Sequence, residues 1–281
     1  MALETRVYQK ENNINLAKLL KESVTAIYSS RFLARQLATR DIKAQYRQSY
    51  LGVFWAFVMP LATAFVWIFL NNSGTVQLTD TGIPYPLYAF SGTLLWSILT
   101  DSIDSPTAST NGARSILSKI NFPKEALIIS GIYKLLFTTS IKILLLLVFV
   151  FIYGVGFHWS LLLFPLAILG AIIIGTTIGL FLTPIGILYT DIGRIVKFGM
   201  QFVMYVTPVV YAIPKEGIMK TLMELNPLTP VILTGRDLIV GHTPEHLGYF
   251  LLVLGCCIPL GILSLLFYKI SIPIIVERLS A

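Results

Sequence analysis

Long stretches without a charged side chain set the strongest limit on what this chain can become. No Asp, Glu, Lys or Arg occurs between Lys142 and Asp191, a run of 48 residues, and further uncharged runs of 32, 20, 17 and 23 residues lie elsewhere. About 20 helical residues cross a hydrocarbon core of roughly 30 Å. Each main run can therefore hold a membrane helix, and the longest must hold more than one.

Composition excludes the ordinary soluble classes. Charged residues make up 12% of the chain and hydrophobic residues 55%, whereas a soluble domain is about one quarter charged. A disordered chain and a disulfide-stapled chain are excluded on the same grounds. The sequence predicts an all-α integral membrane protein.

The uncharged runs divide the chain into a cytoplasmic N-terminal region, 1–50, and a transmembrane domain, 51–281. We predict six membrane spans, near residues 51–71, 84–104, 126–154, 160–189, 195–213 and 244–269. With the N-terminus inside, 16 of the 21 Lys and Arg residues fall on the cytoplasmic side, so we expect both termini in the cytoplasm. The outer segment 214–243 reads as two short re-entrant or interfacial helices, or as a cap lying on the lipid.

Basic residues pattern the N-terminal region. Arg31 and Arg35, and then Lys43 and Arg47, recur four residues apart, with apolar residues such as Leu37 available for the opposite side. This spacing predicts an amphipathic helix on an anionic membrane surface. It serves either as an anchor alone, or also as a contact for a cytoplasmic partner and a phosphate headgroup.

The inner connection 105–125 contains a second amphipathic segment. We predict a short helix at 113–120, with Ile116, Leu117 and Ile120 on one face. That face needs an apolar surface to cover it, which either the membrane or a soluble subunit would supply.

Small and aromatic side chains mark further helix faces. Small residues repeat every four positions in the fourth span, at Ala167, Ala171, Gly175, Gly179 and Thr183. Such a ridge allows a close helix approach, and we favour internal packing over subunit contact. Aromatic rings follow several spans, at Phe54, Phe57, Phe65, Tyr88, Trp96, Phe198, Phe202 and Tyr205. They either form interfacial belts and bundle core, or line a path along which a glycan slides.

Two lysines fall within the third span. Lys134 lies near its inner end and can extend toward water, whereas Lys142 lies deeper and is expected to face a polar cavity or a partner. The carboxylates Asp101, Asp104 and Asp191 are placed at inner helix ends, where solvation explains them.

Several chemical signatures are missing from the sequence. There is no G-x-x-x-x-G-K-[ST] loop to hold nucleotide phosphates, and His242 and His246 lack a third metal ligand. No nucleophile, base and orienting acid stand out as a set. We therefore expect no catalytic site, no metal, no cofactor and no nucleic-acid partner for this chain.

Motifs along most of the chain resemble one family. They are Arg40-Asp41-Ile42-Lys43, Tyr46-Arg47-Gln48-Ser49, Leu51-Gly52, Trp55 with Pro60, residues 117–125, Asp191-Ile192, Gln201, Thr207-Pro208-Val209, Tyr211, Asn226-Pro227-Leu228 and Arg236. In this order they are similar to the ABC-2 type polysaccharide export permeases, the membrane subunits for O-antigen, capsule and teichoic acid. The resemblance covers about residues 35–270.

The resemblance implies a homodimer of this chain, joined to two copies of a separate ABC ATPase that binds ATP and Mg. It also implies a bacterial cytoplasmic (inner) membrane location and export of a polyprenyl-diphosphate-linked polysaccharide, along a path lined by the first, second and fifth spans. An ABC-2 exporter of a drug or other small molecule, or an ATP-independent secondary transporter, is the alternative.

Residue roles follow from this resemblance. The segment that would couple to the ATPase comprises Ile116, Leu117, Lys119 and Ile120. Cations at the inner interface would contact the lipid diphosphate, and the candidates are Arg40, Lys43, Arg47 and Lys134.

Overall fold

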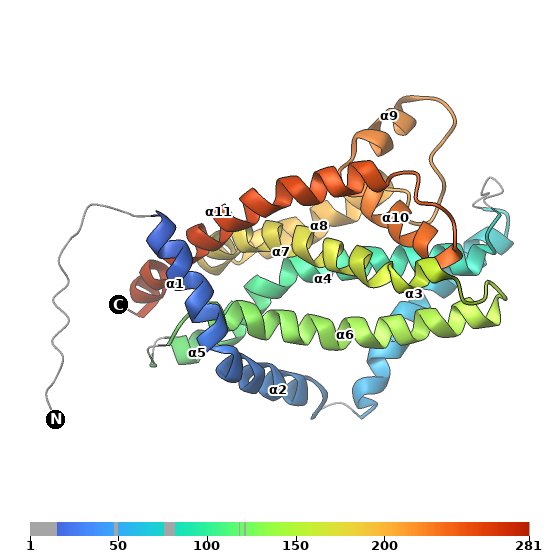
Figure 1. Cartoon of the computed structure of the whole chain (residues 1–281). Helices are drawn as coiled ribbons and strands as arrows, with labels where there is room; N and C mark the ends of the chain where they lie inside the picture. The colour runs from blue at the N-terminus through green and yellow to red at the C-terminus, as the bar shows by residue number, and fades with distance from the viewer. Residues whose placement is uncertain (1–15, 48–49, 76–81, 118, 121, 281) are drawn as a thin grey trace, which may run out of the picture.

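Figure 1 shows a computed structural model of the chain, which describes residues 16–47, 50–75, 82–117, 119–120 and 122–280. Within these ranges every regular element is a helix, which confirms the all-α prediction. The longer helices run side by side along a common axis (Figure 1).

Four helical stretches within the described ranges are long and apolar enough to cross a membrane. They are Gly52–Asn72 (η1, Gly52–Phe54, and α3, Trp55–Asn72), α6 (Glu125–Ile152), Trp159–Leu188 (η2, Trp159–Leu162, and α7, Phe164–Leu188) and most of α11 (Leu247–Ser280). They correspond to the predicted first, third, fourth and sixth spans. Their existence follows from the uncharged runs, because an apolar helix satisfies its own backbone in lipid.

Helix α4 (Tyr85–Gly112) lies at the centre and packs against α3, α6 and α7. It covers the predicted second span but is too polar to count with the four above. It also continues eight residues beyond the predicted end at 104, because its Ser- and Thr-rich last turns pack against α7. Thr107 and Thr183 share a hydrogen bond of 3.0 Å there.

The small-residue ridge of α7 meets α4 directly. All five of its residues are buried, and a Cβ added at Gly179 would lie 2.3 Å from the carbonyl oxygen of Ile103. A Cβ at Gly175 would lie 2.5 Å from the Cβ of Ser102. Internal packing is therefore confirmed as the role of this ridge.

The predicted fifth span, 195–213, is wrong in its second half. Helix α8 (Asp191–Tyr205) rises only about 22 Å, and residues 206–213 form no regular helix. Pro208 explains the break, because proline disfavours helical backbone in the residue before it and donates no hydrogen bond.

The carbonyl groups exposed by that break are bonded by side chains from distant elements. Asn226 donates to the Val206 oxygen (2.9 Å), and Tyr85 donates to the Val210 oxygen (3.3 Å). Arg236 donates to the oxygens of Pro208 (3.1 Å) and Val209 (2.6 Å). Buried non-helical backbone is tolerated here because each of these acceptors has a donor.

The segment predicted to hold two short helices contains α9 (Ile218–Leu225) and α10 (Thr229–Val240). Helix α10 is largely buried and ends at Gly241, whose φ of 88° is the left-handed conformation predicted for a terminating glycine. Helix α9 buries only Met223.

The remaining helices gather at one end of the bundle. Helices α1 (Leu16–Ser29), α2 (Arg31–Arg47) and α5 (Arg114–Leu117) lie near the C-terminal part of α11 (Figure 1). Lys269 of α11 holds α1 there, with its ammonium 3.6 Å from the Glu22 carboxylate and 3.6 Å from that of Glu125.

Candidate functional site

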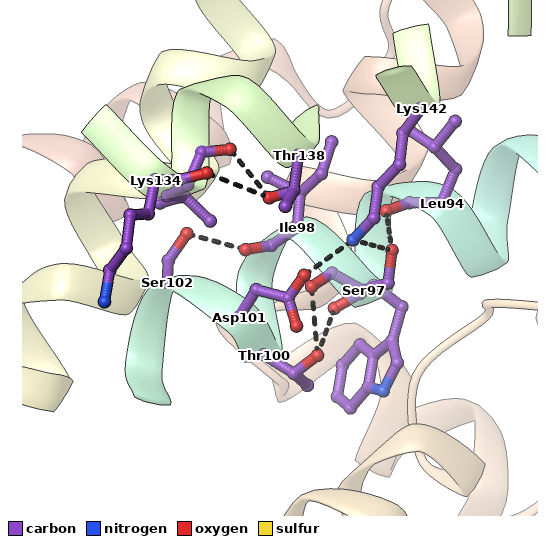
Figure 2. Close-up of polar contacts among 11 residues, drawn as sticks. Leu94, Ser97, Ile98, Thr100, Asp101, Ser102, Lys134, Thr138 and Lys142 are labelled. Atoms are coloured by element: carbon purple, nitrogen blue, oxygen red, sulfur yellow. Dashed lines mark hydrogen bonds and ion pairs between the residues drawn. The ribbon is translucent and has the colours of Figure 1, made fainter. Parts of the chain in front are cut away.

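An ion pair with one buried partner lies where α4 meets α6. The Lys142 ammonium contacts the Asp101 carboxylate at 2.6 Å and donates to the Ser97 hydroxyl at 2.9 Å (Figure 2). The Lys142 side chain is 11% exposed and that of Asp101 48% exposed. The expectation that Lys142 faces a polar cavity is confirmed, whereas the placement of Asp101 at a solvated helix end was wrong, because α4 continues for another eleven residues.

Three cavities meet at Asp101. One of about 400 Å³ lies among α2, α3, α4 and α6 and includes Tyr46, Trp55 and Lys142 in its lining. A second, of about 370 Å³, lies among α4, α7 and α8, and a third, of about 330 Å³, among α2, α4 and α6. Burial raises the pKa of the Tyr46 phenol, which therefore stays protonated and able to donate.

Sequence reasoning missed the polar stripe that produces this site. From residue 93 to residue 109 of α4, every fourth residue is polar: Thr93, Ser97, Asp101, Ser105 and Ser109. Lys134, Thr138 and Lys142 have the same spacing on α6. Residues four apart share a helix face, so this periodicity was a readable signal that the two faces meet.

The four cations predicted for a lipid diphosphate fall into two groups. Arg40 and Lys134 both contact Asp41, at 2.7 and 3.1 Å, so their charges are partly compensated. Lys43 and Arg47 are exposed on α2. The structure thus brings Arg40 and Lys134 together and leaves Lys43 and Arg47 facing outward.

The predicted coupling segment is only partly exposed. Leu117 is 6% exposed and packs with Leu37 of α2 and Leu127 of α6, so within this chain its side chain faces inward, and its coupling role stays a prediction. Ile116 is partly buried at the same cluster, whereas Ile120 is 59% exposed and Lys119 is exposed. Helix α5 itself covers only Arg114–Leu117, not the whole of 113–120.

Lys124 follows the predicted coupling segment in the chain, just before α6. Burial lowers the pKa of the Lys124 ammonium, which lies 4.6 Å from the centre of the Phe122 ring.

The predicted aromatic residues also divide into two groups. Tyr88 and Trp96 are buried within the bundle, and Trp96 lines the cavity beside α8. The others lie on α3 and α8 or next to them and are exposed or half-buried: Phe54, Phe57, Phe65, Phe198, Phe202 and Tyr205. The Tyr88 ring is engaged within the chain, because the Arg236 guanidinium lies 3.6 Å from its centre in a cation–π contact.

Arg236 is a structural residue whose importance the sequence hid. It is 2% exposed, and its two terminal nitrogens hold the broken backbone after α8. A Cβ at Gly92 would lie 1.8 Å from the Val209 oxygen, so the glycine is needed for this approach. Among the described residues, no group of three or more His, Cys, Asp and Glu is arranged to hold a metal ion.

Four long apolar helices beside a more polar central helix indicate a multi-pass membrane protein. Residues 33–238 match the ABC-2 type transporter family, and the chain belongs to this family. The resemblance drawn from the motifs is thereby confirmed.

The chain is also similar to characterised export permeases. It is 27% identical over 222 residues to the O-antigen export system permease protein RfbA of Myxococcus xanthus, which covers 78% of this chain and 84% of that protein. It is 25% identical over 249 residues to the RfbA of Klebsiella pneumoniae, covering 84% and 92%. This protein is therefore a transporter membrane subunit and not an enzyme.

Proposed function

We propose that this chain is the permease subunit of an ATP-driven exporter that moves a polyprenyl-diphosphate-linked polysaccharide, of the O-antigen, capsule or teichoic acid type, across the bacterial cytoplasmic membrane. The observation that carries the proposal is the similarity to O-antigen export permeases over most of both chains. The complex would contain two copies of this chain and two of a separate ABC ATPase, which supplies ATP and Mg binding.

Six spans and cytoplasmic termini complete the proposed topology. Helix α4 would be the second span, and α8 together with the non-helical residues 206–213 would be the fifth, while α10 would enter the outer leaflet without crossing. The contact of α1 with the C-terminal part of α11 supports placing the two chain ends on one side. Most Lys and Arg residues fall on that same side of the proposed topology.

The exposed aromatic faces of α3 and α8 support a path formed between two copies of the chain. Helix α8 buries no residue within the chain, and α3 buries only Ala64. Unpartnered apolar helices of this kind require lipid or a second subunit beside them. Rings such as Phe65 and Phe202 would then face the moving glycan, because aromatic faces attract the C–H groups of sugars.

At the inner side, two contacts are proposed. Lys43 and Arg47, exposed on α2, would bind the diphosphate of the lipid carrier. Ile120, with Lys119 beside it, would insert into the ATPase and transmit its closure to α2 and α6 through the cluster that contains Leu117.

Co-purification and ATPase measurements test the proposal. The permease should bring down a P-loop protein encoded with glycan-synthesis genes, and a lipid-linked glycan should stimulate ATP hydrolysis by the purified complex. Neutralising Lys43 and Arg47 together should weaken this stimulation. Stimulation by drugs in place of glycans would exclude the proposed substrate class.

A secondary transporter is the second candidate, because an ionisable pair deep in a bundle is typical of ion-coupled carriers. The Asp101–Lys142 pair has that character. Transport that persists without any ATPase subunit would favour this candidate.

A further inference from the structure

The cavity among α2, α3, α4 and α6 has a mixed lining. Its apolar lining includes Trp55, Met59 and Pro60 of α3, and polar side chains from α3, α4 and α6 lie among them: Thr63, Thr93, Ser97, Asp101, Thr138 and Lys142. Its volume of about 400 Å³ is within the range of roughly 300–1,000 Å³ that holds small organic molecules.

The threonine hydroxyls of this cavity have already used their protons, whereas the Tyr46 phenol can still donate. Thr63 donates to the Met59 carbonyl, Thr93 to that of Ala89 and Thr138 to that of Leu135, at 3.0, 2.8 and 3.0 Å. Each bond is to the residue's own helix, and Figure 2 shows it for Thr138. A hydroxyl that donates to a carbonyl offers only its lone pairs to a ligand. The polar part of the lining is therefore rich in acceptors.

The charge of the cavity is balanced. Among the described lining residues Asp101 is the only carboxylate and Lys142 the only ammonium group, and they pair with each other at 2.6 Å. One carboxylate oxygen of Asp101 takes the lysine, and no described polar contact reaches the other, which is a further acceptor. A phosphate group brings acceptors and negative charge only, and would meet this carboxylate unfavourably.

We propose that this cavity binds one neutral pyranose ring, which deepens the proposed function and rests on it. Sugar hydroxyls would donate to the threonine oxygens and the free oxygen of Asp101, and they would accept in turn from the Tyr46 phenol, the Gln45 amide and the Trp55 indole. The apolar face of the ring packs on Trp55, and Lys142 is a positioning residue that holds Asp101. The site lies within one protomer and adjoins the α8 cavity at Asp101.

Photolabelling of the full-length chain in lipid nanodiscs tests this site. The probes are diazirine-bearing methyl glucoside, galactoside and mannoside, with crosslinks mapped by mass spectrometry. We expect saturable labelling on cavity residues of α3, α4 or α6, with competition by the unmodified pyranoside but not by inorganic pyrophosphate.

A matched pair of variants provides the control. Thr93→Val removes an acceptor from the cavity, whereas Thr100→Val makes the same change on α4 in the lining of the neighbouring cavity. The apparent affinity should fall roughly three- to tenfold for Thr93→Val and stay unchanged for Thr100→Val. Trp55→Leu, at a half-exposed position, should weaken labelling similarly. Size-exclusion profiles verify that each variant is folded.

The outcomes separate this site from the proposed function. The site is overturned by an absence of saturable labelling with all three pyranosides, by competition with pyrophosphate, or by equal affinities for Thr93→Val and Thr100→Val. If labelling follows the prediction but cells lacking the chain still display their surface glycan, the sugar site stands and the export role fails. If export depends on the chain and labelling fails, the reverse holds.

Discussion

At the scale of single residues, the stability of the helix bundle depends on how its enclosed charged groups are paired. Lys142 is nearly enclosed while Asp101 is half exposed, so the two partners are not equivalent. Removing the Asp101 carboxylate leaves the Lys142 ammonium group unpaired and largely shielded from water. Removing the Lys142 side chain leaves a carboxylate that water can still solvate.

Asp101→Ala should therefore destabilise the protein more than Lys142→Met. We expect a loss of about 2–4 kcal/mol for the first and about 1 kcal/mol for the second, with the double variant recovering much of the loss. Thermal unfolding in detergent measures all three. Equal losses for the two single variants would contradict this account.

Arg236→Leu should be among the most damaging substitutions. It removes the donors for two buried carbonyl groups, and an expected loss of about 3–5 kcal/mol follows from leaving them unpaired. Lys215→Leu, a substitution at an exposed cation of the same outer region, is the control. Comparable expression levels and melting temperatures for both variants would show that Arg236 does not stabilise the non-helical backbone at residues 208–209.

At the scale of elements, the α4–α7 contact depends on the absence of side chains. Gly179→Ala puts a methyl group against the backbone of Ile103, so we expect a loss of about 1–3 kcal/mol. Gly255→Ala, in α11, meets nothing within 4 Å and should cost little. Identical unfolding curves for the Gly179→Ala and Gly255→Ala variants would show that α4 and α7 can move apart to admit a methyl group without loss of stability.

The coupling segment gives a second test at this scale. Ile120→Glu should abolish export and glycan-stimulated ATP hydrolysis while insertion and melting temperature stay normal, because Ile120 is exposed. Leu117→Glu should lower the melting temperature itself, because it buries a charge beside Leu37 and Leu127. Full export by a stable Ile120→Glu protein would remove this contact from the mechanism.

At the scale of the whole molecule, features set by residues close together in the chain could be predicted from the sequence, and contacts between distant segments could not. The apolar spans and the small ridge of α7 were predictable, because uncharged runs and four-residue repeats depend on neighbours in the chain. Pro208 signalled the early end of α8, but the donors for its exposed carbonyls were not predictable, since they come from Asn226 and Arg236, 20 or more residues away. The Asp101–Lys142 pair joins two helices, and the four-residue polar spacing on α4 and α6 was the signal for it that was overlooked.

The central claim is that this chain forms a path and receives its energy from an ATPase partner. Its direct test is transport of a lipid-linked glycan in proteoliposomes that contain the permease with and without that subunit. The account predicts glycan movement only when both proteins and hydrolysable ATP are present. Movement by the permease alone, driven by an imposed ion gradient, would contradict it.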